Sequence, residues 1–152
     1  MMIDPAKSLL LGCLALSFYL VGAIWAHEVD IFRSWRLVGA AEFRALQNAH
    51  WRKLAYWIFS PLALALAGSV ALIWLHPQDS PRWTILANLG LQLLSLALTA
   101  VFWGRWQARL SQDSAGPRGI YLAQILRTHW IRTAIISADG LVMLVWTITV
   151  FA

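Results

Sequence analysis

Residues 83–103 read WTILANLGLQLLSLALTAVFW, a run without a single charged side chain. A helix needs about 20 apolar residues to cross a hydrocarbon core of about 30 Å, so this run is long enough. A backbone in lipid must satisfy its own hydrogen bonds, which predicts a helix here. Three other runs of the chain have the same character. The four predicted spans are residues 8–26, 54–75, 83–103 and 131–151.

The composition of the whole chain indicates a membrane protein. Of the 152 residues, 60% are hydrophobic and 12% are charged, whereas a soluble domain has about 45–50% apolar and about 25% charged residues. The single cysteine, Cys13, excludes an intramolecular disulfide. The sequence therefore predicts one all-α domain over residues 1–152, an integral membrane four-helix bundle built from two helical hairpins, with the lipid bilayer as its immediate partner.

Lys and Arg are distributed unevenly over the connections between the spans. Five lie in the predicted loop 27–53 and four in the predicted loop 104–130, but only Arg82 lies between spans two and three. The positive-inside rule then places both long basic loops in the cytoplasm and both termini outside. We interpret the chain as a bacterial inner-membrane protein. Its net charge of +5 is read as a topology signal, with no nucleic-acid partner.

Two helical extensions are predicted at the cytoplasmic ends of the spans. Apolar residues at three- and four-residue spacing favour helix from Ala41 to Trp57, and residues 119–130 behave similarly before span four. Pro61 lacks a backbone N–H, so span two is expected to kink near Phe59.

The dipeptide His-Trp recurs 79 residues apart, at His50-Trp51 and His129-Trp130, each time opening a span. Duplication of one hairpin explains the recurrence. Chance also explains it, because the chain contains ten tryptophans. An internal repeat is therefore one of two interpretations.

Span three carries Asn88, Gln92, Ser95 and Thr99 on one helical face. Polar groups within lipid usually face the bundle interior, where they bond to other helices or line a polar cavity. Asp139 is the only acid inside any span. An unpaired carboxylate at this depth costs at least a few kcal/mol, so we expect Asp139 to be protonated, paired or in contact with water.

Three histidines lie near the predicted cytoplasmic ends of spans one, two and four: His27, His50 and His129. Imidazole is the commonest metal ligand and the usual haem ligand. The three histidines and Glu28 are therefore candidate ligands of a transition metal. The three histidines without Glu28 are also candidate ligands of a haem cofactor. No short metal-binding signature is present. The alternative is that the histidines are polar anchors at the membrane surface.

Two segments, EFRALQ (42–47) and LRTHWIRT (126–133), resemble the small four-helix membrane proteins grouped with the anthrone oxygenases. The resemblance implies oxygenation of an aromatic or polyketide-like substrate. Carried over position by position, it implies a catalytic set of Gln47, His50, His129 and Arg132. The chain departs from the better-known members at the end of span three, where GRWQ (104–107) replaces an Asn-Pro-like polar segment.

Three functions are consistent with these features. The favoured one is a membrane oxygenase or oxidoreductase that acts on a lipophilic aromatic substrate at a His-centred site near the cytoplasmic face, with Arg132 holding an anionic group or phenolate. The second is a non-catalytic subunit or assembly partner of a larger membrane complex. The third is a small proton-coupled transporter acting as a homo-oligomer, with Asp139, Gln92 and Asn88 along its path.

Overall fold

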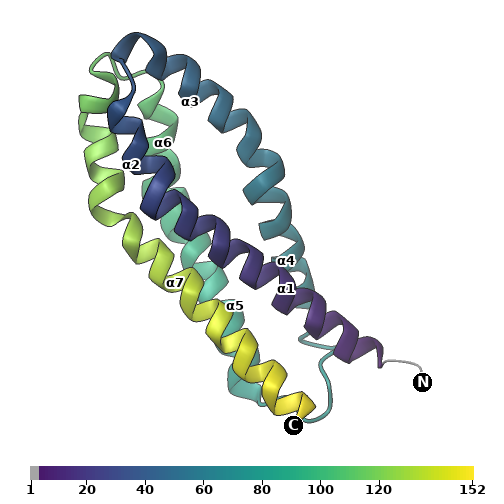
Figure 1. The fold of residues 1–152 in the computed structure, drawn as a ribbon. Helices are drawn as coiled ribbons and strands as arrows, with labels where there is room; N and C mark the ends of the chain where they lie inside the picture. The colour runs from purple at the N-terminus through teal and green to yellow at the C-terminus, as the bar shows by residue number, and fades with distance from the viewer. Residues whose placement is uncertain (1–3) are drawn as a thin grey trace.

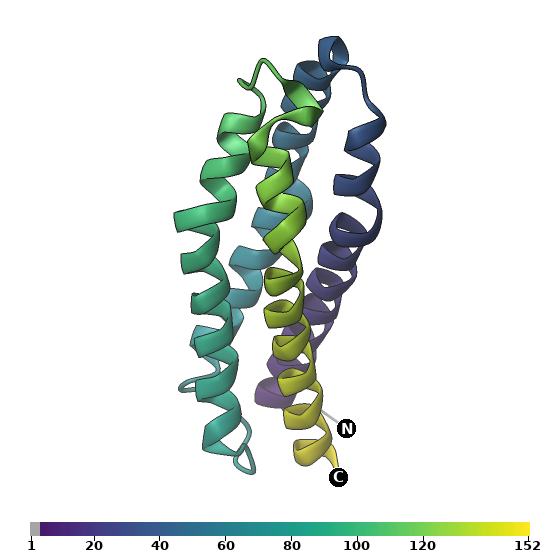
Figure 2. The same ribbon diagram turned by 90° about the vertical axis from the view of Figure 1, so that its left-hand side faces the viewer.

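The computed structural model describes residues 4–152, and every regular element in that range is helical. Four long helices run up and down the molecule as two hairpins (Figure 1). Both termini lie at one end, which we call the terminal end; the opposite end, with the connections at residues 38–39 and 111–119, is the loop end (Figure 2). The predicted all-α four-helix architecture is confirmed.

Three of the four long helices are divided by π turns. The first comprises α1 (Pro5–Ala26), the π turn η1 (His27–Ile31), α2 (Phe32–Ser34) and the 3₁₀ turn η2 (Trp35–Leu37). The second comprises α3 (Ala40–Leu54), the π turn η3 (Ala55–Phe59) and α4 (Ser60–Ala71). The third comprises α5 (Arg82–Leu98), the π turn η4 (Thr99–Trp103) and α6 (Gly104–Leu110). After the 3₁₀ turn η5 (Gly116–Arg118), the fourth is the undivided α7 (Ile120–Phe151).

All four long helices have the length and apolar composition to cross a membrane. They contain 29 to 33 residues each, which is about 44–50 Å of helix against about 30 Å of hydrocarbon. The helix predicted over Ala41–Trp57 is confirmed, and so is the one over residues 119–130. The predicted loops were too long, however, because residues 27–37 and 104–110 are helical as well.

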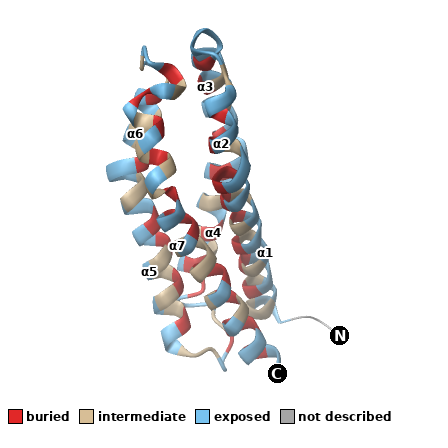
Figure 3. Cartoon of the chain, turned by 60° about the vertical axis from the view of Figure 1, so that its left-hand side comes forward, coloured by how far each residue is buried: buried red, intermediate tan, exposed pale blue. Residues whose placement is uncertain are grey.

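The helical extensions form because they bury an apolar core of their own. Phe32, Trp35 and Leu110 pack with residues of α3 and α7 in a loop-end core. A second core at the terminal end joins α1, α4 and α7. Buried positions face inward along every helix, whereas large apolar side chains such as Leu86 and Leu141 remain on the outside (Figure 3), as expected of a lipid-facing surface.

Close helix packing at the terminal end depends on a small residue. α7 packs against α1 and α5, and α4 packs against α1. At the α1–α4 contact, a Cβ added to Gly68 would lie 2.5 Å from the Sγ of Cys13. Cys13 is buried there, so its environment is that of a core side chain.

Candidate functional site

The predicted site residues meet in the loop half of the bundle. His27 and Glu28 come from η1, His50 from α3, and His129 from α7. The ring centroids of His27 and His50 lie 5.4 Å apart. Phe32 packs against both His27 and His129, with its ring centroid 5.4 Å from that of His27 and 4.6 Å from that of His129. Residues 101 positions apart in the chain, Glu28 and His129, are in direct contact.

The π turns are all near this site. η1 contains His27 and Glu28, η3 follows α3 one turn after His50, and η4 contains Trp103. A π turn inserts an extra residue into a helix and rotates the side chains on either side, and such turns occur frequently at functional sites. In this chain, residues of all three π turns, His27, Ile58 and Thr99, line one common cavity.

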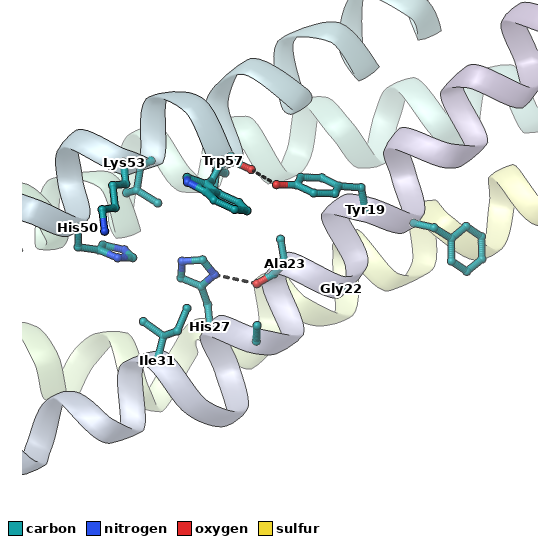
Figure 4. Close-up of a pocket in the computed structure, with 12 residues that line it drawn as sticks. Tyr19, Gly22, Ala23, His27, Ile31, His50, Lys53 and Trp57 are labelled. Carbon is teal, nitrogen blue, oxygen red and sulfur yellow. Dashed lines mark hydrogen bonds between the residues drawn. The ribbon is translucent and has the colours of Figure 1, made fainter.

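The second helix bends where Pro61 was expected to bend it. Pro61 has no N–H for the carbonyl oxygen of Trp57, four residues earlier. The hydroxyl of Tyr19, from α1, donates to that oxygen over 3.0 Å (Figure 4). The predicted distortion near Phe59 is confirmed as the π turn η3. The bend therefore creates a bond between the first two long helices.

Glu28 holds His129 in one orientation. One carboxylate oxygen accepts from Nη2 of Arg33 over 2.8 Å, and the other contacts Nδ1 of His129 over 3.0 Å. Because a carboxylate only accepts, His129 donates from Nδ1, which leaves the lone pair on Nε2. That Nε2 atom is buried and has no hydrogen-bond partner among the described residues.

His27 has the same arrangement of ring nitrogens. Its Nδ1 donates to the carbonyl oxygen of Ala23 over 2.7 Å, so its lone pair is also on Nε2. The Nε2 atoms of His27 and His50 are likewise buried without a partner within residues 4–152. The ring of His50 is held against Trp35, with the centroids 4.9 Å apart. The site therefore presents three imidazole nitrogens that the protein itself does not use.

A groove leads to two of these histidines. It has a volume of about 760 Å³, and its walls come from α1 with η1 on one side and α3 with η3 on the other. Because only two neighbouring helices line it, the groove opens on the side of the bundle. Apolar side chains make up most of the lining, His27 and His50 face each other across it, and Lys53 lies beside His50 (Figure 4).

Arg132 lies deeper, one turn after His129 on α7. It is buried, and its guanidinium carbon lies 5.9 Å from the centre of the Trp103 ring. Trp103 is itself fixed by donating from Nε1 to the Thr128 hydroxyl over 3.0 Å. Within residues 4–152, Arg132 forms no ion pair, and its Nε has no hydrogen-bond partner. Gln47, also predicted, is buried with an unpartnered Nε2.

The polar residues predicted within the spans form a separate layer toward the terminal end. Asp139 accepts from Asn88 over 2.7 Å and from Ser17 over 3.3 Å. Gln92 donates to Ser69 over 2.9 Å. These bonds connect α1, α4, α5 and α7, as expected of polar groups that stabilise helix packing.

Sequence reasoning missed several contributors to the site and the polar layer. Ser17 and Ser69 were not singled out, although Ser17 is the polar member of the buried α1 stripe Leu10, Cys13, Ser17, Leu20 and Ile24. That periodicity is a usable signal. Arg33 and Trp35 carried no comparable signal, because their roles depend on how η1 and η2 turn toward α7 and α3.

The metal prediction receives no support from the geometry. Among residues 4–152, no group of three or more His, Cys, Asp and Glu side chains is arranged to hold a metal ion. The Nδ1 bonds of His129 and His27 leave only Nε2 of each ring for any ligand.

Comparisons with family models, with curated proteins and with solved structures find no match to this chain.

Proposed function

We propose that this chain is a membrane enzyme that takes a lipophilic, weakly acidic aromatic molecule from the bilayer and removes a proton from it. The observation that carries the proposal is the pair of histidines, His27 and His50, whose rings face each other in the side-opening groove and whose Nε2 atoms have no partner among the described residues. A buried polar atom without a partner is uncommon in a folded protein, so two at one position call for a ligand.

The chemistry of the groove suits this class of substrate. Its apolar lining accommodates a ring system, and its volume of about 760 Å³ lies within the range of small-molecule sites. A neutral imidazole can act as a general base, which suits a phenol or a CH₂ group made acidic by flanking rings. The resemblance to anthrone oxygenases favours the same substrates.

Oxidation would follow from the deprotonated substrate. The carbanion and dioxygen give a hydroperoxide once a proton returns, and loss of water leaves a ketone. In sum, R₂CH₂ and O₂ give R₂C=O and H₂O: the carbon loses four electrons, and one oxygen atom enters each product. His27 or His50 would take the first proton and return it to the peroxide, so dioxygen is the only oxidant required.

The test is oxygen uptake by the detergent-purified protein with an anthrone-type substrate. His27→Gln and His50→Gln should each lower the rate by about 100-fold or more, the range for loss of a general base. His76→Gln is the matched control, since His76 follows α4 at the terminal end of the bundle. Full activity in both site variants would overturn the proposal, as would a wild-type protein that binds the substrate without consuming oxygen.

The orientation is proposed with the function. We propose that the loop end faces the cytoplasm of a bacterial cell, because it carries most of the Lys and Arg residues. A periplasm-dependent reporter enzyme fused after Ala152 should be active, and the same reporter inserted at Gln112 should be inactive.

A further inference from the structure

A second, smaller cavity lies inward of the groove. Its volume is about 30 Å³, enough for about two water-sized groups. His27 lines both cavities, so its ring stands where the groove and the inner cavity adjoin. The polar side chains around the inner cavity are those of His27, Thr99, Gln107, His129 and Arg132.

Arg132 has no counter-charge among residues 4–152. Of the seven acidic residues in the chain, the buried ones among those described are Glu28 and Asp139. Both oxygens of Glu28 are taken by Arg33 and His129, and both oxygens of Asp139 by Asn88 and Ser17. A buried charge without a partner destabilises the fold. The Trp103 ring offsets only part of this cost, because a cation–π contact does not neutralise the charge.

We infer that the inner cavity is an oxyanion subsite, in which Arg132 binds the singly charged oxygen of an aromatic ligand whose ring lies in the groove. The chemical class of this ligand is taken from the proposed function, and the subsite adds where its oxygen binds. The cavity admits an oxygen but is too small for a ring.

Proton transfer from the ligand to His27 would create the oxyanion that the subsite binds. Before transfer, Nε2 of His27 carries a lone pair that accepts the ligand O–H. The O–H bond then breaks, its electron pair stays on oxygen, and Nε2 acquires the proton. The resulting oxyanion lies against an imidazolium N–H and the guanidinium, so one negative charge is stabilised by two positive ones and the net charge of the site stays at +1. Gln107 forms no hydrogen bond with another described residue and supplies an amide donor at the cavity wall.

The charged groups around this position are few. Lys53 lies on the groove side, Arg132 on the inner side, and Glu28 behind His129. Glu28 is already paired with Arg33. The net field on a ligand oxygen in the inner cavity is therefore positive and comes chiefly from Arg132.

The test uses para-nitrophenol, whose phenolate absorbs visible light, bound to the purified full-length protein. Bound to the wild type, it should ionise about one to three pH units below its free value, the range for an acid beside an arginine. Arg132→Gln should abolish the shift, and Arg132→Lys should retain part of it. Arg105→Gln is the charge-matched control, because Arg105 is exposed on α6.

A second measurement keeps the inference falsifiable if Arg132→Gln binds poorly. Because Arg132 has no partner to strand, Arg132→Gln should unfold at the same temperature as the wild type or higher. A strongly destabilised variant would reveal a counter-charge within the protein and overturn the inference. An unchanged ionisation shift in Arg132→Gln would overturn it as well.

Sodium formate distinguishes a ligand oxygen from a free anion. If a free anion can also enter the subsite, formate should compete with the nitrophenolate for the wild type and not for Arg132→Gln. Formate competition that persists in Arg132→Gln would overturn the assignment of the subsite to Arg132. An ionisation shift that depends on Arg132, without oxygen uptake on any substrate, would retain the subsite and reject the proposed oxidation. Oxygen uptake with no dependence of the shift on Arg132 would do the reverse.

Discussion

Removing the Asp139 carboxyl should weaken the contact between α1, α5 and α7 by a predictable amount. Asp139→Ala leaves the side-chain amide of Asn88 without an acceptor, whereas the Ser17 hydroxyl can turn to a carbonyl of its own helix. A stranded buried donor costs about 1–3 kcal/mol, and hydrogen bonds between membrane helices average about 0.6 kcal/mol. We therefore expect Asp139→Ala to lower the free energy of unfolding by about 1–2 kcal/mol.

The matched variant is Asp139→Asn, which keeps the shape of the side chain. The introduced amide oxygen can accept from Asn88, and the introduced NH₂ group can donate to Ser17. Asp139→Asn should lower the free energy of unfolding by less than about 0.5 kcal/mol, because no hydrogen-bond donor is left without an acceptor. The contrast between the two variants isolates the hydrogen bonds from the volume of the side chain.

The assay is a double-mutant cycle with Asn88→Ala and Asp139→Ala, measured by SDS-induced unfolding in mixed micelles. The two substitutions together should cost about 1 kcal/mol less than the sum of their separate costs, since contacting residues are coupled. Additive costs would refute the reasoning. So would an Asp139→Asn variant as unstable as Asp139→Ala, because that result would locate the role of Asp139 outside these bonds.

Three further predictions follow from individual contacts. Tyr19→Phe should lower the free energy of unfolding by about 1 kcal/mol, and by less in a Pro61→Ala background, where a restored N–H can reach the Trp57 carbonyl. Equal losses in both backgrounds, measured by thermal unfolding, would contradict this. Gly68→Ala should cost about 1–3 kcal/mol through its clash with Cys13, and a simultaneous Cys13→Ala should recover most of the loss of melting temperature; an equally unstable double variant would show that the clash is elsewhere. Glu28→Gln should let His129 exchange its ring proton between the two nitrogens, which ¹⁵N NMR of the imidazole detects, whereas the wild type should hold it on Nδ1; identical spectra would rule out Glu28 as the group that orients His129.

The apolar runs determined much of the fold because a bilayer leaves a backbone few choices. Runs of about 20 apolar residues predict helices that span it, and four such runs predict a four-helix bundle. The polar stripe of Asn88 and Gln92 could be assigned to the interior for the same reason, since lipid penalises polar side chains on the outside. The distortion of the second long helix could be predicted from Pro61 alone, because the missing N–H is a property of that residue.

Only the tertiary structure decided how the site is assembled. The sequence brought His27, His50 and His129 to the same end of the bundle. The π turns and the crossing of the helices set His27 opposite His50 and directed His129 to Glu28. The unpaired state of Arg132 is also a tertiary fact, because it depends on Glu28 and Asp139 being engaged elsewhere. A periodic pattern specifies which face of a helix is buried, whereas the partner on that face depends on the rotation and crossing of helices distant in the chain.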